Sequence, residues 1–152
     1  REWLEERVRE WTRGRVLEVE VVDSDYELLA RADCAVVKSG TSTLETMLLG
    51  VPFAMVYRLP LASYLLLRPF VRTRTFCLAN LVAEESLVPE FVQEEADGRR
   101  ISSFITSLLA DRAKAGRLKE AFRQVAAKLG DQDSDRKAAE EIIGTFFIPG
   151  SV

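Results

Sequence analysis

Short apolar runs that alternate with a helical pattern constrain the fold of this chain more than any other feature of its sequence. Residues Cys34–Val37 and Phe53–Tyr57 contain no charged side chain, as is typical of strands that helices cover on both faces. Between them, residues 42–49 form an apolar helical pattern that Gly50 and Pro52 end. This alternation predicts an α/β fold with a parallel sheet and helices on both faces.

Further elements are expected on both sides of this unit. Residues Val16–Val22 alternate apolar and acidic side chains like a half-buried strand, and Phe76–Val82 is a candidate last strand. Ser24 and Glu27 form a capping box for a short helix through Ala32. Apolar residues at helical spacing predict helices over Trp3–Trp11, Leu61–Val71, Ile101–Ala110, Ala113–Leu129 and Asp135–Phe147. The last three form a helical C-terminal tail, which we expect to pack on the sheet or to cross back to another domain.

Length and composition exclude several classes of function. The 152 residues fit one domain, and a net charge of −3 gives no reason to expect nucleic acid as a partner. No apolar run approaches the ~18 residues of a membrane span. The chain has no histidine, which excludes a Ser-His triad and a histidine metal site. Cys34 and Cys77 have no metal-binding or CxxC spacing and are expected to be small buried hydrophobes. We therefore expect neither a metal ion nor a cofactor.

The polar turn after the first apolar run is the best candidate for a binding site. The segment from Lys38 to Ser42 leaves a strand and opens a helix, and ligands of open α/β sheets bind beyond the carboxyl ends of the strands. A helix N-terminus attracts phosphate through its unpaired N–H groups and its dipole. Gly40 permits close backbone approach, and its neighbours add hydroxyl groups. The residues alone predict a diphosphate cradle, although Ser42 and Glu45 also have capping-box spacing, so an ordinary helix start is an alternative.

Several segments, in the same order along the chain, resemble lipid-A-disaccharide synthases. These segments are SGTSTLE (39–45), MLLGVP (47–52), MVYR (55–58), FVRT (70–73), LANLV (78–82) and VPEFVQEE (88–95). They are similar to the family's SGTATLE-type helix start, hydrophobic helix with a proline turn, strand ending in Tyr-Arg, basic segment, LPNLLA segment and acidic VPEFLQ-type stretch. The resemblance covers roughly residues 30–147. It departs from the family pattern at Ala79, where proline is usual, and at Glu84-Glu85, where Gly-Arg is common.

The resemblance implies that the chain is the UDP-sugar-binding C-terminal domain of a GT-B glycosyltransferase, with a Rossmann-like parallel sheet and flanking helices. The family transfers 2,3-diacylglucosamine with inversion from its UDP donor to 2,3-diacylglucosamine 1-phosphate. The products are UDP and the β-1,6-linked disaccharide 1-phosphate on the route to lipid A and lipopolysaccharide in Gram-negative bacteria. Residues 1–152 would then be a single partial domain, without the first strand and the N-terminal acceptor domain. The resemblance places no catalytic residue in this chain, and we expect the isolated chain to be inactive in transfer.

The resemblance also assigns the residues that would bind UDP. Among them, Glu45 would accept hydrogen bonds from the ribose hydroxyls, because a carboxylate can accept from two adjacent hydroxyls. Asn80 stands at the asparagine of the family's LPN segment. Arg58 would lie at a strand end near the same crevice, with plain surface charge as its alternative role. The complete set of predicted UDP-binding residues is Ser39, Gly40, Thr41, Ser42, Glu45, Arg58 and Asn80.

The acylated substrates of the family predict contact with a membrane surface. Residues 46–83 contain no acidic side chain, but they include Arg58, Arg68, Arg72 and Arg74 among leucines. Such a mixture suits a helix that lies on anionic lipid, and a core helix with solvated arginines at its end is the alternative. The resemblance implies a cytoplasmic enzyme, peripheral on the inner membrane, whose C-terminal segment forms a homodimer interface or crosses between domains.

Two other interpretations are open. Another GT-B enzyme, such as the transferase that adds N-acetylglucosamine to a lipid-linked muramoyl peptide, also has a glycine turn and a downstream glutamate. The Tyr-Arg, VRT and CLANLV segments favour the lipid A family over it. A non-catalytic α/β fragment that assembles with a partner would suit the leucine-rich helix. Affinity for a nucleotide separates this fragment from both enzymes.

Overall fold

The structure is a computed structural model that describes residues 2–23, 25–68, 75–130 and 134–146. Its strands are β1 (Ala35–Lys38), β2 (Phe53–Tyr57) and β3 (Glu90–Val92). Its helices are α1 (Glu2–Thr12), α2 (Tyr26–Ala30), α3 (Thr41–Leu48), α4 (Leu61–Leu67), α5 (Leu78–Ala83), α6 (Gly98–Ala110), α7 (Arg112–Leu129) and α8 (Ser134–Phe146), and a 3-10 turn, η2, spans Gln93–Glu95. None of the helices in these ranges is long and apolar enough to cross a membrane.

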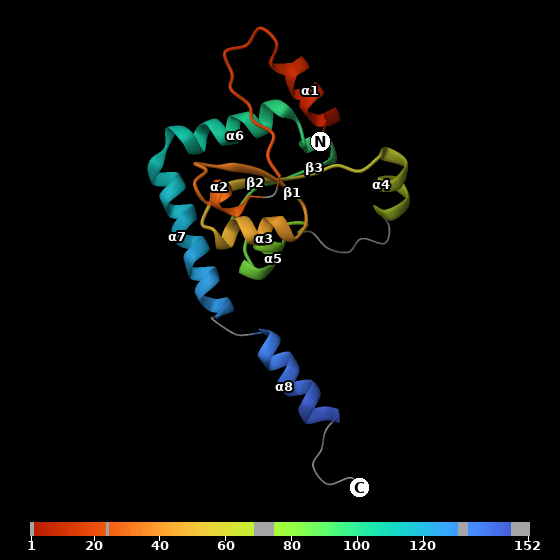
Figure 1. Ribbon diagram of the computed structural model, residues 1–152, viewed down its shortest axis with the longest axis vertical. Coiled ribbons are helices and arrows are strands. Elements are labelled where there is room, and N and C mark those ends of the chain that lie inside the picture. The colour runs from red at the N-terminus through yellow and green to blue at the C-terminus, as the bar shows by residue number, and fades with distance from the viewer. Residues whose placement is uncertain (1, 24, 69–74, 131–133, 147–152) are drawn as a thin grey trace.

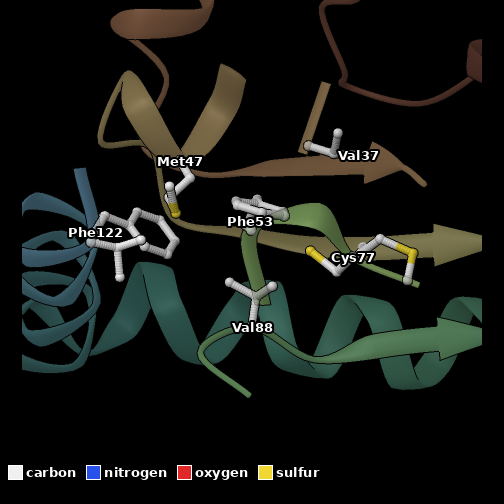
Figure 2. Close-up of a cluster of buried hydrophobic side chains, with 9 residues drawn as sticks. Val37, Met47, Phe53, Cys77, Val88 and Phe122 are labelled. Carbon is white, nitrogen blue, oxygen red and sulfur yellow. The ribbon is translucent and has the colours of Figure 1, made fainter. Parts of the chain in front are cut away.

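The strands form one parallel sheet in the order β1-β2-β3. Val37 of β1 lies beside Met55 of β2, and Tyr57 of β2 lies beside Val92 of β3. The arrows in Figure 2 run in the same direction, so the carboxyl ends of all three strands meet at one edge of the sheet. The predicted parallel α/β sheet is confirmed.

Helices cover both faces of this sheet. Helix α6 lies on one face, α3 and α5 lie on the other, and α7 runs along the end of the sheet from α6 toward α3 (Figure 1). The helices predicted for the tail are therefore confirmed, and the first two of them pack on the body of the fold. Helix α8 instead extends away from the sheet (Figure 1), and its Ile142 and Ile143 are each 56% exposed.

The core is centred on β2, because this strand is buried on both faces. The side chains of Phe53, Ala54 and Met55 are 0% exposed, which explains why the strand has no alternation of apolar and polar residues. Phe53 packs against Phe122 of α7 with ring centroids 5.7 Å apart, and Met47 of α3 belongs to the same buried cluster (Figure 2). Burying a side chain of this size contributes about 1.5–3 kcal/mol.

The strand predicted at Val16–Val22 is not formed, and that prediction is wrong for this structure. Val16 and Leu17 are 110% and 59% exposed. Alternation of apolar and polar residues yields a strand only where a neighbouring strand satisfies the backbone groups, and no described strand pairs with this segment. The preceding helix α1 forms as predicted, but its Trp3 and Trp11 are 70% and 57% exposed.

Two other predictions need correction. The run Phe76–Val82 is not a strand, because α5 begins at Leu78; a short apolar run has no periodicity that separates a strand from a buried helix. The third strand is β3, which contains Glu90 and was not predicted.

Helix α2 is capped by Asp25, whose Oδ1 accepts from the Leu28 N–H at 2.9 Å, and it ends at Ala30.

Some predictions fall outside the described residues. These are the capping serine at position 24, the end of the predicted α4 helix beyond Arg68 and the last residue of the predicted α8 helix, at position 147. Of the two cysteines expected in the core, Cys77 is 0% exposed, whereas Cys34 is partly exposed. The cysteine prediction is thus confirmed fully for Cys77 alone.

Candidate functional site

Three loops with polar side chains leave the carboxyl edge of the sheet. Strand β1 continues into Ser39 and Gly40, β2 continues into Arg58, and β3 continues into Gln93. The parallel register, in which Lys38 lies beside Val56 and Tyr57 beside Val92, brings the three loops to the same edge. Since ligands of open α/β sheets bind beyond this edge, the candidate site is here.

Helix α3 opens directly onto this edge without a side-chain cap. Its N-cap is Gly40, whose φ of +141° is a backbone conformation that other residues rarely adopt. A Cβ atom at Gly40 would meet no atom within 4 Å, so space is open beside the turn. The capping box expected from Ser42 and Glu45 as the alternative is not formed, because Ser42 is already inside the helix. The Thr43 N–H donates to the Gly40 carbonyl at 3.2 Å. The N–H groups of Thr41 and Ser42, which have no partner within a helix, are thus available to an anion.

Ser39 has a different position from its neighbours. Its N–H donates to the Val56 carbonyl at 3.0 Å, and its Oγ donates to the Phe76 carbonyl at 2.7 Å. Both of its donors are therefore used inside the protein. In contrast, the side chains of Thr41 and Ser42 are exposed at the start of the helix.

Glu45 lies one turn into α3, above Thr41. Residues four apart share a face of a helix, and side chains lean toward the N-terminus. The opposite face carries Thr43 and Thr46, which are 0% and 1% exposed, and Thr46 Oγ1 donates to the Ser42 carbonyl at 2.7 Å. Glu45 is half-buried and borders the helix start, where a carboxylate also stabilises the helix dipole.

Asn80 does not present its amide to the open edge. It is 3% exposed, and its Nδ2 donates to the Val88 carbonyl and to Glu90 Oε1, both at 2.9 Å. Its Oδ1 accepts from the Val88 N–H at 3.0 Å. These bonds occupy the donor and acceptor groups of the amide and tie α5 to β3.

Glu90 continues this network toward the helix start. Its Oε2 accepts from the Phe76 N–H at 2.6 Å, and the Phe76 carbonyl accepts from Ser39 Oγ. Phe76 is thereby held at both backbone groups, by Glu90 at the start of β3 and by Ser39 directly after β1. Glu90 was not predicted as a site residue, although a lone glutamate inside the apolar run VPEFV was the available signal.

Arg58 reaches the same edge from the end of β2. It is exposed and borders a hollow of about 600 Å³ with Leu59, Pro60, Leu61, Gln93 and Glu94. Across the described ranges, Arg58 takes part in no ion pair. Its positive charge is therefore available to a ligand at this edge.

A second hollow, of about 670 Å³, adjoins the first and shares Leu61, Gln93 and Glu94 with it. Its walls come from α4, from Thr75 and Phe76, and from β3. Arg68 at its rim lies over the Tyr64 ring, with its guanidinium carbon 5.9 Å from the ring centroid. The carboxyl edge therefore combines an uncapped helix start, two arginines and mixed polar and apolar walls.

The surroundings of both cysteines raise the pKa of their thiols. Burial raises the pKa of the Cys77 thiol, against the lowering effect of hydrogen bonds from Asn80, Thr43 and Ala79, so the thiol stays protonated near neutral pH. Burial and the nearby Asp33 raise the pKa of Cys34. The described part of the chain contains no group of three or more acidic or cysteine side chains placed to hold a metal ion.

A parallel sheet whose carboxyl edge carries an exposed arginine and a helix that begins at a glycine is typical of nucleotide-binding α/β domains. The sequence profile of one such group, described as lipid-A-disaccharide synthetase, matches residues 5–144. The chain belongs to this family.

Individual relatives agree with this assignment. The chain is 39% identical to the lipid-A-disaccharide synthase of Anaeromyxobacter dehalogenans (strain 2CP-C) over 131 residues, which are 86% of the chain and 34% of that protein. It is 39% identical to that of Syntrophus aciditrophicus over 75% of the chain and 30% of the relative, and 32% identical to that of Nitrosococcus oceani over 79% of the chain and 31% of the relative. The chain thus spans about a third of the length of these relatives.

The bonds of Asn80 predict a structural cost when its amide is removed. We expect Asn80→Ala to lower the free energy of unfolding by about 1–3 kcal/mol, because it leaves buried groups of Val88 without partners. Urea denaturation measures this change. The matched control on the same helix is Leu81→Ala, which alters a side chain that is 56% exposed and should change stability by less than about 0.5 kcal/mol. An Asn80→Ala protein as stable as the original would contradict the structural role.

Proposed function

We propose that this chain is the UDP-binding part of a lipid-A-disaccharide synthase with the GT-B architecture. Family membership supports the assignment. The observation that locates the proposed site is the start of α3 at Gly40, which has no side-chain cap and is open to the carboxyl edge of the sheet. The complete enzyme would transfer 2,3-diacylglucosamine from its UDP donor to 2,3-diacylglucosamine 1-phosphate, and release UDP.

In this proposal the diphosphate lies at the N-terminus of α3. The N–H groups from Gly40 to Ser42 and the hydroxyls of Thr41 and Ser42 donate to phosphate oxygens, and the positive end of the helix dipole favours the charge. Glu45 accepts hydrogen bonds from the ribose hydroxyls. Ser39 contributes by shaping the turn, since its donors are bound to Val56 and Phe76. Asn80, likewise, supports the pocket through Glu90 rather than through direct contact.

The chemical task of this chain would be to stabilise the leaving group. In an inverting transfer, a base removes the proton of the acceptor hydroxyl, the resulting oxygen attacks the anomeric carbon, and the bond to the UDP oxygen breaks. Negative charge grows on the departing diphosphate, where preorganised N–H groups and the Arg58 guanidinium lower the barrier. The base would come from another part of the enzyme, so this chain by itself would not catalyse transfer.

The same proposal includes further strands beside β1. The outer edge of β1 has no neighbour among the strands of the described ranges, and Val36 on this strand is 50% exposed. The segment 16–22 keeps the alternation of a strand while its apolar side chains are exposed. Strands from the remaining part of a longer protein would pair with both, bury these side chains and complete the sheet.

We also propose that α4 contacts the cytoplasmic surface of the inner membrane. Its Leu61 and Leu66 are 68% and 70% exposed, and Arg68 follows them at the C-terminal end of the helix. Exposed leucines beside arginine suit the interface of an anionic bilayer. The exposed Ile142 and Ile143 of α8 would pack either on another domain of the enzyme or on a second copy.

The UDP site is tested by calorimetric titration of UDP into the protein. We expect Glu45→Ala to weaken UDP binding about tenfold or more, because the loss of a hydrogen bond to a charged group costs roughly 1.5–3 kcal/mol. The matched control is Glu85→Ala, which removes an exposed carboxylate beyond α5 and should leave the affinity unchanged. A folded protein without affinity for UDP, or equal weakening by both substitutions, would contradict the proposed site.

The membrane proposal is tested by co-sedimentation with vesicles that contain anionic phospholipid. We expect the triple variant Arg68→Ser, Arg72→Ser and Arg74→Ser to bind more weakly, since each basic residue near an anionic surface contributes about 1 kcal/mol. The matched control is Arg112→Ser, Arg117→Ser and Arg123→Ser, on the exposed side of α7. Equal binding of the original protein and this triple variant would remove the segment 61–74 from the membrane contact.

A further inference from the structure

Gln93 and Leu59 form a paired hydrogen bond across the carboxyl edge of the sheet. The Leu59 N–H donates to Gln93 Oε1 at 2.6 Å, and Gln93 Nε2 donates to the Leu59 carbonyl at 3.2 Å. The two residues are 34 positions apart in the sequence. One side-chain amide thus satisfies both backbone groups of a loop residue that lies beyond the end of β2.

This pair extends the sheet by one step after the backbone of β3 has turned away. The last backbone pairing of the two strands joins Tyr57 to Val92. The next residue on β3, Gln93, has a φ of +52°, a left-handed conformation in which a residue other than glycine is strained. Its backbone leaves the ladder there, and its carboxamide replaces the missing peptide group, because a carboxamide presents an N–H donor and a C=O acceptor in one plane, as a peptide group does.

The bonded loop residue lies between two functional neighbours. Arg58, directly before Leu59, is the exposed cation of the candidate site, and Pro60, directly after it, is the N-cap of α4. Loops otherwise move more than the strands that they follow. With both backbone groups of Leu59 held, the direction in which Arg58 leaves the sheet is fixed.

We propose that Gln93 is a positioning residue of the UDP site, which fixes Leu59 and thereby orients the Arg58 guanidinium toward the diphosphate. The inference rests on the proposed function for the identity of the ligand, and it names a residue that acts through Arg58 without touching UDP. Glutamine is required because no other side chain of this length supplies both a donor and an acceptor. A glutamate would lack the donor, and its charge would attract Arg58 away from the ligand.

Amide hydrogen exchange tests the positioning step without UDP. We expect Gln93→Met, which keeps the length of the side chain but removes both hydrogen bonds, to speed exchange of the Leu59 N–H about three- to tenfold. The matched control is Gln124→Met on α7, where the glutamine amide is exposed and donates to Glu120; it should leave exchange at Leu59 unchanged. Unchanged exchange at Leu59 in the Gln93→Met protein would overturn the inference.

UDP affinity tests the functional step through a double-mutant cycle. We expect Arg58→Ala to weaken UDP binding about tenfold, Gln93→Met to weaken it about three- to tenfold, and the double variant to bind within about twofold of Arg58→Ala alone. A merely structural glutamine would instead lower affinity by the same factor in both backgrounds, and this additivity would overturn the inference. If the original protein shows protected Leu59 exchange but does not bind UDP, the proposed function fails, and the assigned link between Gln93 and the diphosphate fails with it.

Discussion

The burial of β2 on both faces is the constraint on which the rest of the structure depends. With Phe53, Ala54 and Met55 fully removed from solvent, helices must lie on both sides of the sheet and the connections between strands must cross over it. Parallel strands then end at the same edge. Loops that are distant in the sequence therefore meet there, and the polar side chains of the candidate site come together without being adjacent along the chain.

Hydrogen bonds between side chains and loop backbones hold this edge in shape. Ser39 and Glu90 fix both backbone groups of Phe76, and Gln93 fixes both backbone groups of Leu59. Residues of this kind are polar, partly buried and fully engaged inside the protein. They leave the uncapped start of α3 and the Arg58 guanidinium as the groups that face outward, which suits a site that receives an anion.

The sequence predicted the parts of the fold that local patterns determine. The apolar runs at β1 and β2 and the helical spacing in α3, α6 and α7 were sufficient, because burial itself imposes those patterns. The strand expected at 16–22 failed because a strand depends on a partner that its own sequence does not specify. Strand β3 was missed because Glu90 interrupts its apolar character, and α5 was assigned to the wrong class because six residues are too few to define a period.

The sequence was sufficient to predict where the candidate site lies, but not the role of each residue in it. The strand, glycine turn and helix start located Gly40 and Thr41 correctly at the open edge. The sequence did not reveal that the side chains of Ser39 and Asn80 form hydrogen bonds to other residues of the protein. Gln93 was hidden for the same reason, since its contribution depends on a residue 34 positions away that only the folded sheet brings near.

Whether the carboxyl edge of the sheet is a nucleotide site is tested most directly by an NMR titration of the ¹⁵N-labelled protein with UDP. We expect the largest amide shift changes at Gly40, Thr41 and Ser42, with smaller changes at Glu45 and Leu59. Helix α7 on the far end of the sheet should be unaffected. Shift changes that cluster on α6 and α7 without any at the start of α3, or no changes at saturating UDP, would contradict a nucleotide site at this edge.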